Sequence, residues 1–212
     1  MQLRKLLILL TLLPGAVFAQ KIAPDSTFVF SQNNQLFKYI TGNGTQLVSS
    51  ALDNIGSASV TYQKANGHFR TSQQAENGSN ILFATEGIST VNRFKVYGSF
   101  KFSRAWQDSL AWTLQGIPNT INPYYFLAGK AGKYQTINYD LNALVTYRLW
   151  EDKLYLGAGI NYFYNTTTRS VDPRPSVQTF HNLLSAEIIY KTGRQTFGLG
   201  GLWGYEHESN GV

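Results

Sequence analysis

The residue types that most often carry catalysis or bind metals are sparse in this sequence. It has three histidines, His68, His181 and His207, and it has no cysteine. It lacks both the HExxH pattern and any cysteine-based ligand spacing, so a zinc site has little support. We therefore expect no catalytic residue, no metal and no cofactor, and we class the chain as a protein without enzymatic activity.

Two short runs near the C-terminus contain residue types that do chemistry in other proteins. The stretch 198–204 is rich in glycine but lacks the Lys-Ser or Lys-Thr pair of a phosphate-binding loop, so its glycines indicate strand curvature. The run Glu206-His207-Glu208-Ser209 combines an acid, a base and a nucleophile. A triad needs these groups to meet in space, which a local run does not ensure. A lipid hydrolase with His181 or His207 as its base is a minor hypothesis.

A stronger signal is the alternation of polar and apolar residues over long segments. Residues 135–149 place apolar side chains at odd positions and mostly polar ones at even positions, and residues 93–104 alternate in the same way. This period of two indicates strands with one apolar and one polar face. The polar faces carry both signs of charge and supply the residues that would line the lumen of a closed barrel: Lys95, Tyr97, Lys101, Asn138, Asp140, Asn142, Arg148, Asn161, His181 and Glu187.

The predicted strands are long for a soluble sheet, where most strands have about 5–6 residues. Fifteen residues at roughly 3.3 Å each give about 50 Å, which spans a bilayer when tilted by about 45°. We expect roughly nine strands. They cover residues 56–64, 68–74, 79–86, 93–104, 109–115, 135–149, 153–165, 178–191 and 195–206.

The connections between these strands alternate in length. Short turns are predicted near Gln107, Asp152 and Gly193, and long links at 116–132 and 166–177. Outer-membrane barrels have short periplasmic turns and longer outer loops.

Aromatic side chains gather near the predicted strand ends, as they do in the two interfacial girdles of such barrels. The outer ends would carry Tyr162, Tyr164, Phe180 and Tyr205, and the periplasmic ends Trp106, Tyr147, Tyr190 and Phe197.

The first residues resemble a secretory signal peptide. Arg4 and Lys5 are basic, residues 6–13 are apolar but too short to span a bilayer, and Pro14 ends that segment. We predict cleavage after Ala19 and export of the mature chain. The chain has 212 residues and a net charge of +6, and its dispersed basic residues give no indication of nucleic-acid binding.

These observations predict an all-β fold, an antiparallel transmembrane β-barrel with an up-and-down meander. We expect residues 1–19 to form the signal peptide, 20–55 a periplasmic-side lead-in, and 56–212 the barrel. Bacterial single-chain barrels have an even number of strands, so about nine strands indicate an incomplete barrel and a truncated chain. The alternative is an eight-stranded barrel in which one weak strand is wrong.

Four short motifs, in this order along the chain, resemble a family of uncharacterised outer-membrane β-barrel proteins from Bacteroidota. They are Gly67-His68-Phe69-Arg70, Tyr97-Gly98-Ser99-Phe100, Asn122-Pro123-Tyr124-Tyr125 and Asp172-Pro173-Arg174-Pro175. The resemblance implies the fold and the location, but no substrate and no catalytic residue. Members of the family look longer than this chain, which would make it an N-terminal fragment.

Three functions remain open at this point. The first is a porin-like outer-membrane channel or transporter for small molecules, with membrane lipid and a small solute as its partners. The second is a structural or assembly barrel whose loops hold surface or secretion partners. The third is the lipid hydrolase already mentioned.

Overall fold

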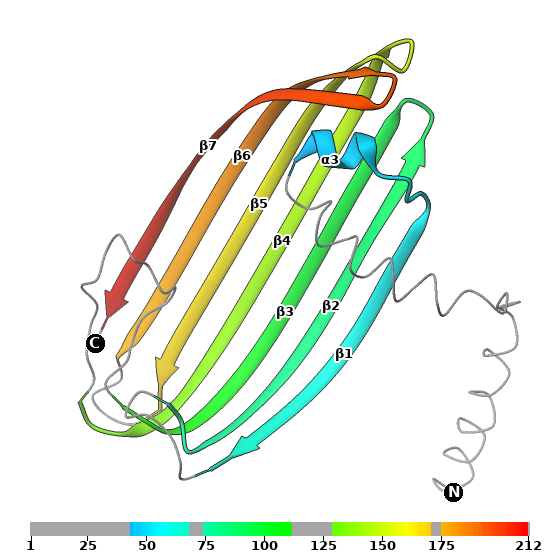
Figure 1. Cartoon of the computed structure of the whole chain (residues 1–212). Coiled ribbons are helices and arrows are strands. Elements are labelled where there is room, and N and C mark those ends of the chain that lie inside the picture. Colours follow the sequence, from blue (N-terminus) through cyan, green and yellow to red (C-terminus); the bar gives the residue numbers. More distant parts are fainter. Residues whose placement is uncertain (1–42, 68–73, 112–128, 171–174, 212) are drawn as a thin grey trace, which may run out of the picture. The chain divides into compact units, whose positions relative to one another are not determined.

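The computed structural model describes residues 43–67, 74–111, 129–170 and 175–211, which all belong to one compact unit, residues 40–212. Within these ranges the chain forms one short helix and seven strands (Figure 1). The elements are α3 (Gly44–Ser49), β1 (Ile55–Asn66), β2 (Asn77–Val91), β3 (Phe94–Leu110), β4 (Gly132–Trp150), β5 (Leu154–Arg169), β6 (Ser176–Thr192) and β7 (Gln195–Gly211).

The strands form a single antiparallel sheet in which each strand pairs with the next one along the chain. This meander confirms the predicted all-β, up-and-down architecture. The sheet is open among the described residues, with β1 and β7 as its two edges. Six strands have 15 to 19 residues each, and β1 has 12.

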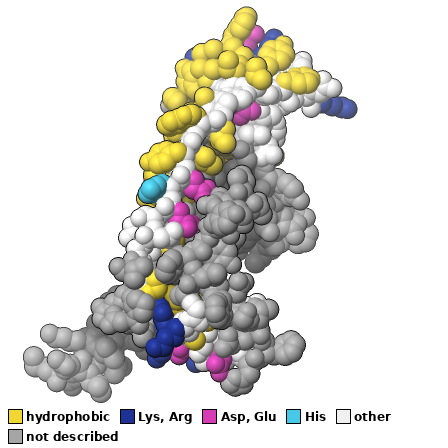
Figure 2. Space-filling view, turned by 90° about the vertical axis from the view of Figure 1, so that its left-hand side faces the viewer, with side chains coloured by type: hydrophobic (Ala, Val, Ile, Leu, Met, Phe, Trp, Pro, Cys, Tyr) yellow, Lys and Arg dark blue, Asp and Glu magenta, His cyan; other side chains and the backbone are white. Residues whose placement is uncertain are grey.

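Alternation along each strand separates two faces. We call the face against which α3 lies the inner face and the opposite one the outer face. The outer face exposes large apolar side chains, including Val60 at 73%, Ile188 at 57% and Leu199 at 81%. Figure 2, which views the sheet from the β7 side, shows hydrophobic side chains gathered over the part of the sheet near the short connections.

Connection lengths differ between the two ends of the sheet. Residues 92–93, 151–153 and 193–194 join strands at one end, which we call the short-connection end, and residues 67–76, 111–131 and 170–175 join them at the long-connection end. Positive φ angles at Asn92, Glu151, Asp152 and Gly193 allow the short turns. The predicted short turns near Asp152 and Gly193 are therefore confirmed.

The predicted turn at 105–108 is wrong. Strand β3 continues through Trp106 to Leu110 because this segment pairs with β2 on one side and with β4 on the other. A register shift between Gln107 and Leu110, with Ser109 at φ 61°, is the only irregularity there. Trp106 consequently lies at the long-connection end rather than at the end predicted for it.

Two of the nine predicted strands are not found as separate strands among the described residues. In the predicted strand 109–115, residues 109–110 belong to β3 and 112–115 lie outside the described ranges. In the predicted strand 68–74, residues 68–73 lie outside those ranges. The predicted signal peptide and the motif Asn122–Tyr125 also lie outside them.

The helical content of the described part is low, and no helix in it is long and apolar enough to cross a membrane.

The turn between β6 and β7 provides a test of the sheet geometry. Gly193 has a φ of 51°, a left-handed conformation that costs an L-residue about 1–2 kcal/mol, whereas Arg194 does not share it. We expect Gly193→Val to lower the free energy of unfolding by about this amount. Arg194→Val should have a much smaller effect. Urea titration of both variants measures the difference, and equal losses would contradict the assigned turn.

Candidate functional site

The candidate site is the inner face of the sheet. The register places all the predicted lumen-lining residues on this face. Lys101 lies opposite Asp140 in the neighbouring strand. Asn142 lies opposite Asn161. The sequence pattern therefore identified one common face, and α3 occupies part of it near the short-connection end (Figure 1).

The start of α3 is bound by a carboxylate from the sheet. Glu187 of β6 accepts hydrogen bonds from the backbone N–H of Gly44 at 2.7 Å and of Thr45 at 3.3 Å. The Thr45 hydroxyl donates to the other oxygen of the same carboxylate. The Asn43 side chain caps the helix by accepting from the Gln46 N–H at 2.9 Å. These bonds satisfy N–H groups that have no partner within a helix.

The end of α3 is bound by a cation from the sheet. The Lys95 ammonium of β3 donates to the backbone carbonyl of Ser50, the residue that follows the helix, at 2.5 Å. The Ser49 hydroxyl donates to the Thr196 hydroxyl of β7 at 3.1 Å. The anion at the N-terminus and the cation at the C-terminus both match the helix dipole, and their hydrogen bonds are charge-assisted.

Close packing accompanies these polar bonds. Leu47 is fully buried and Val48 is 9% exposed. A Cβ atom on Gly44 would approach the Ile189 side chain to 2.8 Å and Glu187 to 2.9 Å. A Cβ atom on Gly198 of β7 would overlap the Thr45 hydroxyl and the Glu187 carboxylate. The helix can therefore lie this close to the sheet only because both positions are glycine.

A six-residue helix is unstable on its own, because nucleation costs more than so few hydrogen bonds return. Its stability comes from docking on the inner face. Two of the predicted lumen residues, Lys95 and Glu187, therefore bind a segment of the chain itself. Sequence reasoning missed α3 because six residues give no helical periodicity, although Asn43 followed by Gly44-Thr45 is a usable capping signal.

Farther along the inner face, polar side chains form a hydrogen-bonded network across strands. The Asn138 amide donates to the Ser103 hydroxyl at 2.9 Å, and the Asn165 amide donates to Asn138. The His181 Nε2 atom lies 2.5 Å from the Asn161 amide oxygen. The His181 ring also stacks on Phe163, with the ring centroids 5.5 Å apart. His181 is thus held within this network and is not paired with a nucleophile in the described contacts.

The charged residues that were predicted to line the lumen lie at different positions along the strands of the inner face. Lys101 and Asp140 form an ion pair at 4.0 Å in the middle of the sheet. The Tyr97 hydroxyl, near α3, donates to the Glu86 carboxylate at 3.5 Å. Arg148 lies at the short-connection end, where it binds Asp152 at 2.6 Å.

At the long-connection end, the inner face carries an apolar cluster that the sequence analysis did not identify. Leu110, Tyr134 and Val177 are buried there, and Ala75 packs against them. Arg169 lies over the Tyr134 ring at 5.9 Å and donates to the Ala131 carbonyl at 3.1 Å. The polar stretch of the inner face therefore lies between α3 and this cluster.

The run from Glu206 to Ser209 does not bring its acid, base and nucleophile together. Alternation along β7 places Glu206 and Glu208 on the inner face and His207 and Ser209 on the outer face. Glu208 accepts a hydrogen bond from the Thr179 hydroxyl at 3.3 Å. Among the described residues, no group of three or more His, Cys, Asp or Glu side chains could hold a metal ion.

The docking of α3 can be tested by thiol labelling, because the chain has no cysteine of its own. In a Val48→Cys background, Glu187→Gln keeps the shape of the side chain but removes the charge that binds the helix N-terminus. We expect this change to weaken the docking of α3 by about 1 kcal/mol. The introduced cysteine is then exposed more often, and maleimide labels it roughly fivefold faster. Glu206→Gln, on the same face but away from α3, should leave the rate unchanged. Equal rates in both variants would refute the role assigned to Glu187.

The family comparison covers the part of the chain described above. A model for a family of unknown function, DUF6850, matches residues 44–212. The match begins at the first residue of α3 and includes all seven strands, so the helix belongs to the family domain together with the sheet. Comparisons with curated proteins and with solved structures gave no match. Since the family model matches more than half of the chain, the protein belongs to the DUF6850 family of unknown function.

Proposed function

We propose that this protein is exported by its signal peptide and forms part of an outer-membrane β-barrel that passes small polar solutes. The location agrees with its resemblance to Bacteroidota outer-membrane proteins. The observation that carries the proposal is the outer face, where large apolar side chains are exposed over all seven strands. Soluble monomeric proteins rarely expose a continuous apolar surface of this extent, whereas lipid covers it without cost.

The height of the apolar band fits a bilayer. On β4, apolar side chains occupy the outer face at every second residue from Ile137 to Leu149. Twelve residue steps of roughly 3.3 Å give about 40 Å, or about 28 Å when tilted by about 45°. The hydrocarbon core is about 30 Å thick.

Aromatic side chains border this band. Toward the long-connection end, rings on neighbouring strands contact one another: Tyr139 packs on Phe102 at 5.2 Å, and Phe180 packs on Tyr205 at 5.3 Å. Toward the short-connection end, Phe94 packs on Tyr147 at 4.9 Å. Such rings favour the headgroup level, and pairs of aromatic girdles are typical of outer-membrane barrels.

The two kinds of connection give the proposed orientation. Short turns face the periplasm in outer-membrane barrels and long loops face outward. This assignment places α3 at the periplasmic end, in agreement with the lead-in expected for residues 20–55. Solutes would move along the inner face, past Lys101 and Asp140, and meet α3 as a constriction.

Membrane insertion can be tested with one charged substitution on the outer face. Leu141→Arg places a charge within the apolar band and should lower stability in lipid vesicles by about 2–4 kcal/mol. Gln135→Arg, on the same strand and face but beyond the band, should cost at most about 1 kcal/mol. Urea unfolding from phosphatidylcholine vesicles measures both values. A full chain that is monomeric in water without detergent would contradict the membrane assignment.

Conductance tests the role of the inner face and of α3. We expect single-channel currents in planar bilayers from the closed barrel of which this sheet forms part. Gly198→Val should raise the conductance because its side chain overlaps the site of Thr45 and Glu187 and displaces α3. Gly201→Val is the matched control, since a Cβ atom at Gly201 meets open space. A membrane-inserted chain that carries no current in any of these forms would refute the channel.

A second candidate, a structural barrel that holds protein partners, is favoured by the long connections at one end, especially residues 111–131. Stable copurification of a partner, without conductance, would support this function instead.

A further inference from the structure

We infer that the outer face at the long-connection end binds an anionic lipid whose headgroup carries phosphate on sugar, as lipid A does. This inference rests on the proposed membrane location and adds a ligand to it. It depends on basic side chains, aromatic rings and a surface hollow of the outer face. These features lie just beyond the aromatic side chains that border the apolar band at the long-connection end.

The charges of the outer face are confined to this end. Within the seven described strands, the outer face carries three cations, Lys64 of β1, Arg104 of β3 and Lys133 of β4, and one acid, Asp108. Asp108 lies 3.9 Å from Lys133, and the two side chains are 44% and 71% exposed. Such an exposed pair is weak and leaves the ammonium accessible to a stronger anion.

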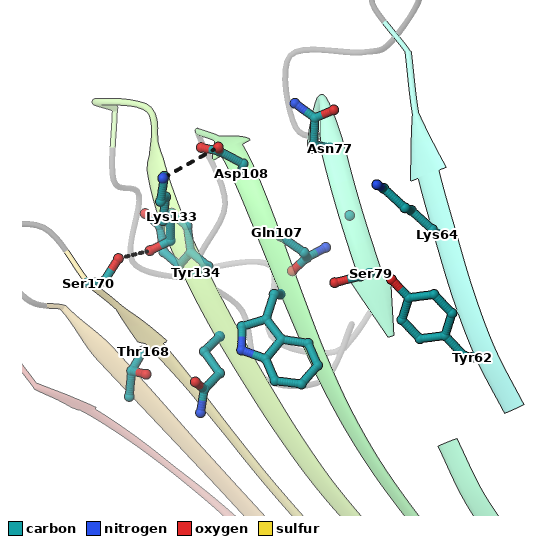
Figure 3. Close-up of a pocket in the computed structure, with 13 residues that line it drawn as sticks. Tyr62, Lys64, Asn77, Ser79, Gln107, Asp108, Lys133, Tyr134, Thr168 and Ser170 are labelled. Carbon is teal, nitrogen blue, oxygen red and sulfur yellow. Dashed lines mark hydrogen bonds and ion pairs between the residues drawn. The ribbon is translucent and has the colours of Figure 1, made fainter. Parts of the chain in front are cut away.

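A hollow of about 500 Å³ runs across the ends of β1 to β5 at this level (Figure 3). Its lining includes Tyr62, Lys64, Ser79, Trp106, Lys133 and Thr168. The ladder places several of these side by side, because Lys64 pairs with Ser79, which pairs with Trp106. Figure 3 shows Lys64 and Lys133 on different strands of the hollow, so an elongated ligand could reach both.

The chemistry of the lining selects the class of ligand. Lys and Arg side chains bind phosphate. The hydroxyl groups of Ser79 and Thr168 suit the polar side of a sugar, and the ring of Tyr62 suits its apolar side. The Arg104 guanidinium lies over the Trp106 ring at 4.9 Å, which holds both at the surface. Acyl chains of a lipid held here would lie along the adjacent apolar band.

The short-connection end provides a contrast. Three of its cations, Arg93, Lys153 and Arg194, lie in or next to the turns rather than on the outer face of a strand. Lys153 is paired with Glu151 at 3.7 Å. Replacing these three therefore removes the same charge from the protein without touching the hollow.

The test uses the closed barrel that contains this sheet, inserted in phosphatidylcholine vesicles. Insertion is established first from its electrophoretic mobility before and after heating. Diphosphoryl lipid A is then titrated in and binding is followed by tryptophan fluorescence. We expect Lys64→Gln/Arg104→Gln/Lys133→Gln to weaken binding on the order of 100-fold, from about 1 kcal/mol per cation. Arg93→Gln/Lys153→Gln/Arg194→Gln should bind as the unmodified chain does, and dephosphorylated lipid A should bind weakly to all three.

Each other outcome contradicts the inference. If both triple variants lose affinity equally, binding follows net charge alone. If the chain inserts but neither variant changes the affinity, the hollow is not a lipid site while the membrane proposal stands. If the chain does not insert, both proposals are wrong.

Discussion

The structure depends on an antiparallel ladder whose register is uninterrupted through the middle of the sheet. Within the described strands, shifts occur only between Gln107 and Leu110 and between Arg148 and Trp150, close to strand ends. A slip of one residue would exchange the two faces of a strand. Because no described strand slips in its central part, large apolar side chains are exposed on the outer face of all seven strands, and the hydrogen-bonded polar side chains of neighbouring strands share the inner face.

The outer and inner faces of the sheet differ in what their side chains contact. The outer face has no protein layer over it in the described ranges, and its large apolar side chains are exposed. On the inner face, polar side chains of neighbouring strands hydrogen-bond to one another. The carboxylate of Glu187 and the ammonium of Lys95 are compensated by the two ends of one helix, which stabilises both charges and the helix.

The sequence allowed prediction of those features that depend on a period of two. Strands β4, β5, β6 and β7 were located within a few residues, and the predicted inner-face side chains share one face. The end of β3 was mispredicted because Ala105 to Asp108 resembles a turn in composition, whereas pairing with two neighbouring strands keeps it extended. The cluster of Leu110, Tyr134 and Val177 could not be found, since it joins residues far apart in the sequence.

The binding of α3 also constrains the order in which the chain can assemble. Gly44 and Glu187 are separated by 143 positions, so this contact closes a very long loop. The helix is among the first described residues to leave the ribosome, yet its carboxylate partner belongs to the sixth strand and its glycine neighbour, Gly198, to the seventh. Docking of α3 must therefore be a late event in folding. A docked α3 indicates that β6 and β7 have already formed.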